Sequence, residues 1–317
     1  MTTKVRQKWD ERDVPAVSGK TVLITGANSG LGFETARVLA ARGGHIIMAC
    51  RNADKAHAAI NRIQQAVPGA ALEFQQLDLS SLDAIERACD EITQKHQHLD
   101  LLINNAGVMW MAPGRTIDGF ETHFGTNHLG HFAFTARLLP LLQHRPGARI
   151  VTLSSIAHRM ARIYFDDLWL EHGYGRQKAY GQSKLANLMF ALELQRRLEA
   201  VGAEAISVAA HPGVAGTNLA SPALEQIGLR RLAALASRIG PYVARKPIQG
   251  ALPTLYAATM DDVRGGEYFG PGRFYEIFGY PARGRPTRYA RDPDIAQRLW
   301  ELSEELTGVK PGLRPGV

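Results

Sequence analysis

The sequence predicts a doubly wound α/β fold, in which one parallel sheet carries helices on both faces. Short β-branched or apolar runs alternate with longer stretches of helical period, which indicates consecutive βαβ units. The strand-like runs are continuously apolar, as is typical of strands buried on both faces, and such units cross over in the right-handed sense. No linker, repeat or low-complexity tract interrupts this order. We therefore expect a single domain over residues 1–317.

The expected elements follow one another regularly along the chain. Six strands are expected at "TVLIT" (21–25), "HIIMAC" (45–50), "LEFQQLDL" (72–79), "LDLLINNAG" (99–107), "ARIVTLSS" (148–155) and "EAISVAAHPG" (204–213), with a seventh near "EYFGP" (267–271). Helices are expected over 31–43, 53–66, 82–96 and 120–142, and a further helix holds Tyr180. Residues 292–308 have an acidic start, an apolar stripe and a glycine stop, which predicts a closing helix.

Composition argues against a disulfide framework or a metal centre. The chain has 45% hydrophobic residues and only two cysteines, Cys50 and Cys89, neither of them in a CxxC motif. We expect both thiols to be reduced and buried. The closest approach to a histidine cluster is His123, His128 and His131, which lacks metal-ligand spacing. These histidines are interpreted as structural, and no metal is expected.

Charge and targeting signals favour a soluble, cytoplasmic chain. No apolar stretch is long enough to span a membrane, and the charged start lacks the apolar core of a signal peptide. The net charge is +7, with much of the excess in late, loop-like arginines that no nucleic-acid-binding motif accompanies. We expect no nucleic-acid partner and no integral membrane segment.

One segment falls outside the βαβ pattern. Residues 219–245 place Leu224, Ile227, Leu232, Leu235 and Ile239 on one helical stripe beside arginines. A membrane-surface helix is one interpretation. The segment follows a strand's carboxyl end, where ligands bind in open α/β sheets, which favours a helical lid over a substrate pocket.

Three glycines lie between the first strand and the first helix. In "TGANSGLG" they are Gly26, Gly30 and Gly32, spaced as TGxxxGxG. Side chains at such positions would hold a diphosphate away from the backbone amides, and the helix N-terminus attracts its negative charge. A plain tight turn is the alternative. The position of the loop in the first βαβ unit favours a dinucleotide site of the Rossmann type.

A second group of residues has the chemistry of proton transfer. Tyr180 and Lys184 are four apart on a helix, so both side chains leave the same face. A nearby ammonium lowers the pKa of a phenol toward the range useful for acid/base catalysis. "VTLSS" ends a strand with Ser154 and Ser155, and "NHLG" supplies Asn127 from the preceding helix. These groups are expected to converge at the carboxyl edge of the sheet.

Taken together, TGANSGLG, NNAG, NHLGHF, VTLSS, YGQSK and HPG resemble the short-chain dehydrogenase/reductase superfamily over residues 19–270. The finer texture, including "SSIAH" and "HPGV", resembles its retinol-dehydrogenase-like branch, which also includes protochlorophyllide-reductase-like bacterial proteins. The resemblance implies Ser155, Asn127, Tyr180 and Lys184 as catalytic residues. With the glycine loop and a strand-end arginine, the expected cofactor-binding set is Gly26, Asn28, Ser29, Gly30, Leu31, Gly32, Arg51, Asp78, Leu79, Asn104, Ala106, Gly107, Tyr180, Lys184, Pro212, Gly213 and Thr217.

The end of the second strand bears on the choice of cofactor. NAD-selective folds carry a carboxylate there, which bonds the ribose and repels a 2'-phosphate. This chain has Cys50 at that place, followed by Arg51, and Lys55 lies one helical turn further on. The uncharged Ser29, where some NADP-binding relatives carry a basic residue, argues the other way. We predict NADP(H), with NAD(H) as the alternative.

The sequence thus predicts an oxidoreductase that moves a hydride between a nicotinamide and an apolar alcohol or carbonyl, with Tyr180 as general acid/base. Reduction of a carbon-carbon double bond is an alternative that uses the same proton donor. A non-catalytic, nucleotide-sensing protein is another, although every catalytic position is filled. The long helices near 120–142 and 180–199 are compatible with a homo-oligomer.

Overall fold

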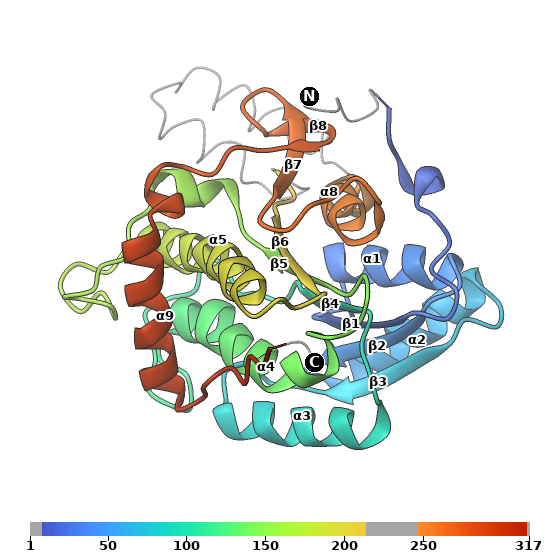
Figure 1. Ribbon diagram of the computed structural model, residues 1–317, viewed down its shortest axis with the longest axis horizontal. Coiled ribbons are helices and arrows are strands. Elements are labelled where there is room, and N and C mark those ends of the chain that lie inside the picture. The colour runs from blue at the N-terminus through green and yellow to red at the C-terminus, as the bar shows by residue number, and fades with distance from the viewer. Residues whose placement is uncertain (1–7, 214–245, 316–317) are drawn as a thin grey trace.

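A central sheet with helices on both faces dominates the computed structural model, which describes residues 8–213 and 246–315 (Figure 1). In the described part, eight strands follow the order β3-β2-β1-β4-β5-β6-β7-β8. Their bounds are β1 Thr21–Thr25, β2 His45–Cys50, β3 Leu72–Gln76, β4 Leu101–Asn104, β5 Arg149–Leu153, β6 Ile206–Ala210, β7 Tyr268–Arg273 and β8 Phe278–Arg283. All neighbours from β3 to β7 pair in parallel. The predicted doubly wound fold, with its seventh strand, is confirmed.

The eighth strand was not predicted. β8 runs antiparallel to β7, and the turn between them holds Phe274, Tyr275 and Glu276 with left-handed φ values of 48°, 54° and 66°. The sequence hides this strand because Gly279 and Pro281 interrupt any apolar run. β8 is an edge strand, where a proline is tolerated.

The helices form two layers against the sheet. Their bounds are α1 Gly30–Ala41, α2 Ala53–Ala66, α3 Leu82–Lys95, α4 Gly130–Leu138, α5 Arg176–Ala200, α8 Pro247–Thr259 and α9 Pro293–Thr307. One buried cluster joins α1, α2 and α8 to one face of the sheet, and another joins α3, α4 and α5 to the opposite face. The sequence did not predict α8, because Pro253 lies inside it and interrupts a helical pattern.

The helix predicted over 120–142 consists of consecutive segments. A π-helical stretch, η2 (Phe124–Leu129), leads into α4, and a 3-10 turn, η3 (Leu139–Leu141), follows. π-helical turns are frequent at functional sites because the wider turn displaces side chains relative to an α-helix. Here the wide turn carries Asn127, one of the predicted catalytic residues.

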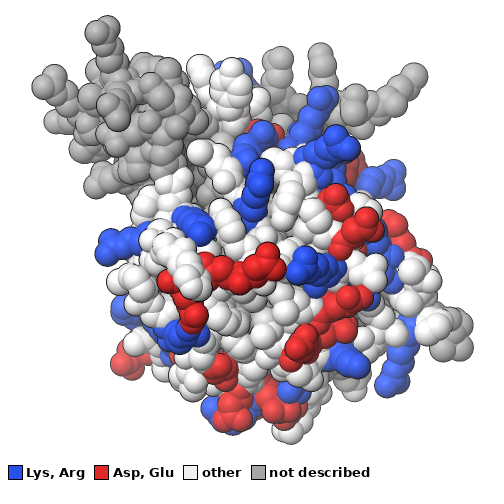
Figure 2. Space-filling model, turned by 90° about the vertical axis from the view of Figure 1, so that its left-hand side faces the viewer, with Lys and Arg blue, Asp and Glu red and all other residues white. Residues whose placement is uncertain are grey.

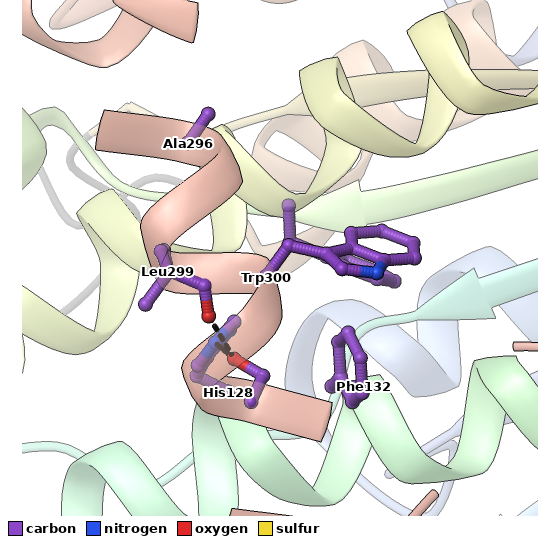
Figure 3. Close-up of a pocket in the computed structure, with 7 residues that line it drawn as sticks. His128, Phe132, Ala296, Leu299 and Trp300 are labelled. Atoms are coloured by element: carbon purple, nitrogen blue, oxygen red, sulfur yellow. Dashed lines mark hydrogen bonds between the residues drawn. The ribbon is translucent and has the colours of Figure 1, made fainter. Parts of the chain in front are cut away.

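The C-terminal helix α9 packs across α5 and the η2–α4 helix (Figure 3). The ring of Trp300 lies with its centroid 5.1 Å from that of Phe132 and 5.8 Å from that of Phe190. His128 Nε2 lies 2.9 Å from Ser303 Oγ, and burial lowers the pKa of His128 to about 3. His128 is therefore a neutral residue of the core, and the chain's own last helix covers this side of α5.

Charged groups near α5 are paired with one another. Glu193 contacts both Arg196 and Arg197 at 2.7 Å. On the face drawn in Figure 2, acidic and basic side chains lie interspersed over much of the surface.

Both cysteines are free and buried, as expected. Among residues 8–213 and 246–315, the helices are too short or too polar to cross a membrane.

Candidate active site

A cavity of about 330 Å³ opens where the chain order reverses, between β1 and β4. In doubly wound sheets ligands bind at this topological switch point, outside the carboxyl ends of the strands. The walls come from the segments that follow β1, β2, β3 and β4, and from η2. They are Gly26, Asn28, Ser29, Leu31, Gly32, Ala49, Cys50, Arg51, Leu77, Asp78, Leu79, Asn105, Ala106, Gly107, Val108 and Thr126.

The glycine loop after β1 makes the floor of this cavity. Gly26 has a φ of 68°, which side-chain-bearing residues rarely adopt. A Cβ on Gly32 would collide with the carbonyl oxygen of Gly26, so the helix can start here only without a side chain. Ser29 precedes α1, and its side chain does not cap the helix. The free amides at the start of α1 therefore suit an anionic group such as a diphosphate.

Two charged side chains line the far end of the cavity. Arg51 is exposed at the end of β2, and among the described residues its guanidinium has no acidic partner. Asp78 accepts hydrogen bonds through Oδ1 from the amide and the hydroxyl of Ser80, at 2.9 and 2.7 Å. Its other carboxylate oxygen has no hydrogen-bond partner in the described part of the chain and could accept from a ligand.

The prediction differs from the structure at Asn104. Its side chain is fully buried and donates to Thr135 Oγ1 and Thr152 Oγ1, at 2.8 and 3.3 Å. The cavity wall is formed instead by Asn105, whose Nδ2 donates to the Thr25 carbonyl at 2.8 Å. Successive side chains at a strand end point to opposite sides. A prediction that is displaced by one residue therefore selects the core residue Asn104 in place of the cavity-wall residue Asn105. Gly30 also lies outside the cavity wall.

The serine pair at the end of β5 is divided between two environments. Ser154 is buried, and its hydroxyl donates to the carbonyl oxygen of Lys184 at 2.8 Å. Ser155 begins the next turn, and its hydroxyl forms a hydrogen bond with Tyr180 that lowers the pKa of the phenol. Only the second serine is thus placed to share a ligand oxygen with Tyr180.

Burial determines the protonation states of Tyr180 and Lys184. It raises the pKa of Tyr180, against the lowering effect of the Ser155 hydrogen bond. It lowers the pKa of Lys184 from 10.5 to about 8. The sequence predicts that the Lys184 ammonium lowers the pKa of the Tyr180 phenol. In the structure Nζ lies 6.0 Å from the Tyr180 ring centroid, and the pKa of Tyr180 is raised instead. Tyr180 is therefore protonated at neutral pH, the form that can donate a proton.

Asn127 ties the π-helical turn to the loop after β4. Its Oδ1 accepts from the Val108 amide at 2.8 Å, and its Nδ2 donates to the Val108 carbonyl at 3.0 Å. Nδ2 also donates to Ser183 Oγ at 2.9 Å, and Ser183 donates in turn to the Tyr180 carbonyl at 2.8 Å. The amide of Asn127 thereby links the helix that carries Tyr180 to the cavity wall.

His131 connects this group to the end of β1, a role that sequence analysis missed. Its Nδ1 donates to the Asn127 carbonyl at 2.8 Å, and its Nε2 lies 2.9 Å from Thr25 Oγ1. Burial lowers its pKa to about 4, so the ring is neutral. The one available signal was its spacing of four residues from Asn127 on a helix.

The turn after β6 carries Pro212 and Gly213, two of the predicted cofactor-binding residues. Gly213, with a φ of 70°, donates its amide to His211 Nδ1 at 3.2 Å, and Pro212 is half-buried. Thr217 and the lid expected over 219–245 lie outside the described residues.

The strand order and the switch-point cavity define a doubly wound, Rossmann-like protein. The model of the short chain dehydrogenase family matches residues 20–228, and the chain belongs to that family. It is therefore an oxidoreductase of a family that uses NAD(P)(H). The floor of glycines, the uncapped helix start and the cavity suit such a dinucleotide.

Its relatives confirm the branch that the motifs predicted. Human retinol dehydrogenase 13 is 39% identical over 303 residues, which cover 94% of this chain and 88% of the relative. Mouse retinol dehydrogenase 12 is 39% identical over 296 residues, with 93% and 88% covered.

Two solved structures illustrate the structural likeness. An uncharacterized protein from Mycobacterium paratuberculosis is 41% identical, with a TM-score of 0.80 and coverage of 96% of this chain and 99% of that one. The Pseudomonas aeruginosa RhlG/NADP active-site complex is 23% identical, with a TM-score of 0.59 and coverage of 80% and 94%. The second likeness concerns the fold alone.

Proposed function

We propose that the enzyme transfers a hydride between NADP(H) and an apolar alcohol or carbonyl compound. The observation that carries the proposal is the hydrogen bond between Ser155 and Tyr180, together with Asn127 and Lys184, which lie against Gly107 in the wall of the switch-point cavity. When bound, the nicotinamide supplies or accepts the hydride. The chain's own residues position the reacting carbon and move the proton.

The roles follow from the state of each side chain. Tyr180, protonated at neutral pH, donates its proton to the substrate oxygen during reduction, and Ser155 holds that oxygen by a second hydrogen bond. Lys184 is anchored to the Leu153 carbonyl at 3.1 Å, and its Nζ lies against Gly107 in the cavity wall, where it would hold the ribose of a bound cofactor. In the oxidation of an alcohol the same groups act in reverse.

The preference for the phosphorylated cofactor rests on the end of β2. Cys50 is buried where a carboxylate would repel a 2'-phosphate, and Arg51 lies in the cavity wall without an acidic partner among the described residues. A guanidinium forms a planar, charged fork that matches a phosphate. The carbonyl substrate is proposed to be apolar because the relatives are named as retinol dehydrogenases.

The test is a screen in which consumption of NADPH is followed with retinaldehyde, smaller aldehydes, ketones and enones. Turnover of aldehydes or ketones supports the proposal. Turnover of enones alone, with reduction of their double bond, would favour carbon-carbon reduction instead. Binding of NADPH without turnover of any of these compounds would favour a nucleotide-sensing protein.

A further inference from the structure

A buried carboxylate and a buried imidazole lie beside Tyr180, outside the group described above. Glu121 is 2% exposed and His123 is 0% exposed. The rings of His123 and Tyr180 meet edge to face, with centroids 6.3 Å apart. A buried ionisable pair needs internal partners, because the loss of hydration otherwise destabilises the fold.

The hydrogen bonds define which nitrogen of His123 carries the proton. The Met111 amide donates to Nε2 at 3.1 Å, so Nε2 is unprotonated and the proton lies on Nδ1. Nδ1 lies 2.9 Å from Glu121 Oε1 and donates to it. Glu121 also accepts from the His123 amide at 3.0 Å and the Phe124 amide at 2.7 Å. Burial raises the pKa of Glu121, but these hydrogen bonds lower it by more, so the net pKa is below the usual value and the carboxylate is ionised.

A third residue, Tyr174, completes the network from the segment that precedes α5, residues 161–175. The hydroxyl of Tyr174 lies 3.3 Å from Glu121 Oε1 and 3.3 Å from the Met111 carbonyl oxygen. His123 thus binds the amide of Met111, while Tyr174 reaches its carbonyl.

The segment held in this way, residues 107–111, passes beside the proposed catalytic residues. A Cβ on Gly107 would lie 3.1 Å from Asn127 Oδ1 and 3.3 Å from Lys184 Nζ, so the segment starts in contact with both. Asn127 then binds both peptide groups of Val108. The segment ends at Met111, where His123 holds it next to the Tyr180 ring.

The segment between its two anchors is apolar and strained. Val108, Met109 and Trp110 are half-buried, and Met111 is 43% exposed. Trp110 has a φ of 60°, and its buried indole N–H has no hydrogen-bond partner among residues 8–213 and 246–315. Such a conformation persists only where the surroundings hold it, and strained residues of this kind cluster at ligand sites.

We propose that Glu121, His123 and Tyr174 are positioning residues that hold the end of segment 107–111, residues 109–111, as the substrate-side wall next to Tyr180. Their effect is on the substrate and not on the proton transfer, because His123 and Tyr174 bond the peptide groups of Met111 and Glu121 orients His123. Among the described residues, none of the three forms a hydrogen bond with Tyr180. The inference rests on the proposed function for its kinetic arm only.

The first arm measures the end of the segment itself by hydrogen exchange at the amides of residues 109–111. Tyr174→Phe removes the hydroxyl, and Glu121→Gln removes the charge at nearly unchanged size. Both are expected to speed exchange in this segment. Tyr164→Phe is the matched control within residues 161–175. Tyr164 contacts Lys178 through its ring, whose centroid lies 4.2 Å from Lys178 Nζ, so the loss of its hydroxyl leaves that contact in place. Equal exchange in Tyr174→Phe and Tyr164→Phe would overturn the proposal.

The second arm compares KM with kcat for an aldehyde that the wild type reduces. Loss of a hydrogen bond of this kind is expected to raise KM about three- to tenfold in Tyr174→Phe, with kcat and NADPH affinity retained. A fall in kcat at constant KM would contradict a positioning role. If the wild type reduces no carbonyl compound, the proposed function fails, and the exchange arm still decides whether the network holds the segment.

Discussion

Lys184 Nζ donates to the carbonyl oxygen of Leu153 at 3.1 Å, at the strand end that also carries the serine pair. The next residue, Ser154, donates back to the Lys184 carbonyl at 2.8 Å. The end of β5 and the third turn of α5 are therefore joined by reciprocal bonds. Because of this junction, the positions of Ser155 and Tyr180 depend on each other.

Replacement of Tyr180 by Phe is expected to abolish most turnover while NADPH affinity stays unchanged. The substitution deletes the proton donor and keeps the ring in contact with His123. General acid/base catalysis contributes about a hundred- to ten-thousandfold. Steady-state kinetics and a fluorescence titration with NADPH measure the two effects. Wild-type turnover in this variant would remove Tyr180 from the mechanism.

The two serines should respond differently to replacement by Ala. Ser155→Ala is expected to lower turnover, because its hydroxyl is shared with Tyr180. We expect only a small loss of unfolding free energy, because the Ser155 cap on the Ala157 amide is long, at 3.3 Å. Ser154→Ala removes the buried hydroxyl that bonds the Lys184 carbonyl and is expected to cost about 0.5 to 1.5 kcal/mol of stability. Kinetics and denaturant unfolding of both variants test the division. A larger catalytic loss in Ser154→Ala would reverse the assignment of the catalytic serine.

The depressed pKa of Lys184 has a consequence for stability. The folded protein releases this proton near pH 8, whereas the unfolded chain keeps it until about pH 10.5. The unfolded state thus binds more protons between these values, and stability rises with pH through this window. Between pH 7.5 and 9.5, the unfolding free energy of wild type should gain about 2 kcal/mol relative to Lys184→Met. Parallel pH dependences of the two proteins would show that the Lys184 pKa is not lowered.

Arg51→Ala is expected to weaken NADPH binding and leave NADH binding nearly unchanged. A charge-assisted hydrogen bond contributes about 1.5 to 3 kcal/mol, which is about ten- to a hundredfold in affinity. Arg62→Ala is the control, because Arg62 on α2 is also exposed but lies over the ring of Phe33 on α1. Equal affinity of the wild type for the two cofactors would refute the NADP preference, without touching the assignment of hydride transfer.

The extent to which the fold could be predicted follows from how each element is buried. Strands buried on both faces, such as Thr21–Thr25, are continuous apolar runs and can be identified directly. β8 is interrupted by Pro281 and α8 by Pro253, so local pattern argues against both, and tertiary contacts stabilise them. The π-helical turn at Asn127 could not be predicted either, because the spacing of apolar residues does not distinguish a π-helical turn from an α-helical one.

The candidate site divides in the same way. Motifs that stand on one element, such as Tyr180 and Lys184 on α5, could be placed from their spacing. The contact of Glu121 and His123 with Tyr174 joins residues more than fifty positions apart, and no spacing reveals it. The exchange of Asn104 for Asn105 reflects a one-residue uncertainty about where β4 ends.

The central claim is that the enzyme moves a hydride directly between the nicotinamide and the carbonyl carbon of a substrate. The most direct measurement uses NADPH carrying deuterium at C4, in separate preparations labelled on each face, with an aldehyde that the wild type reduces. We expect deuterium on the carbinol carbon of the product from one preparation and none from the other. Product formed without deuterium from either preparation would contradict the account.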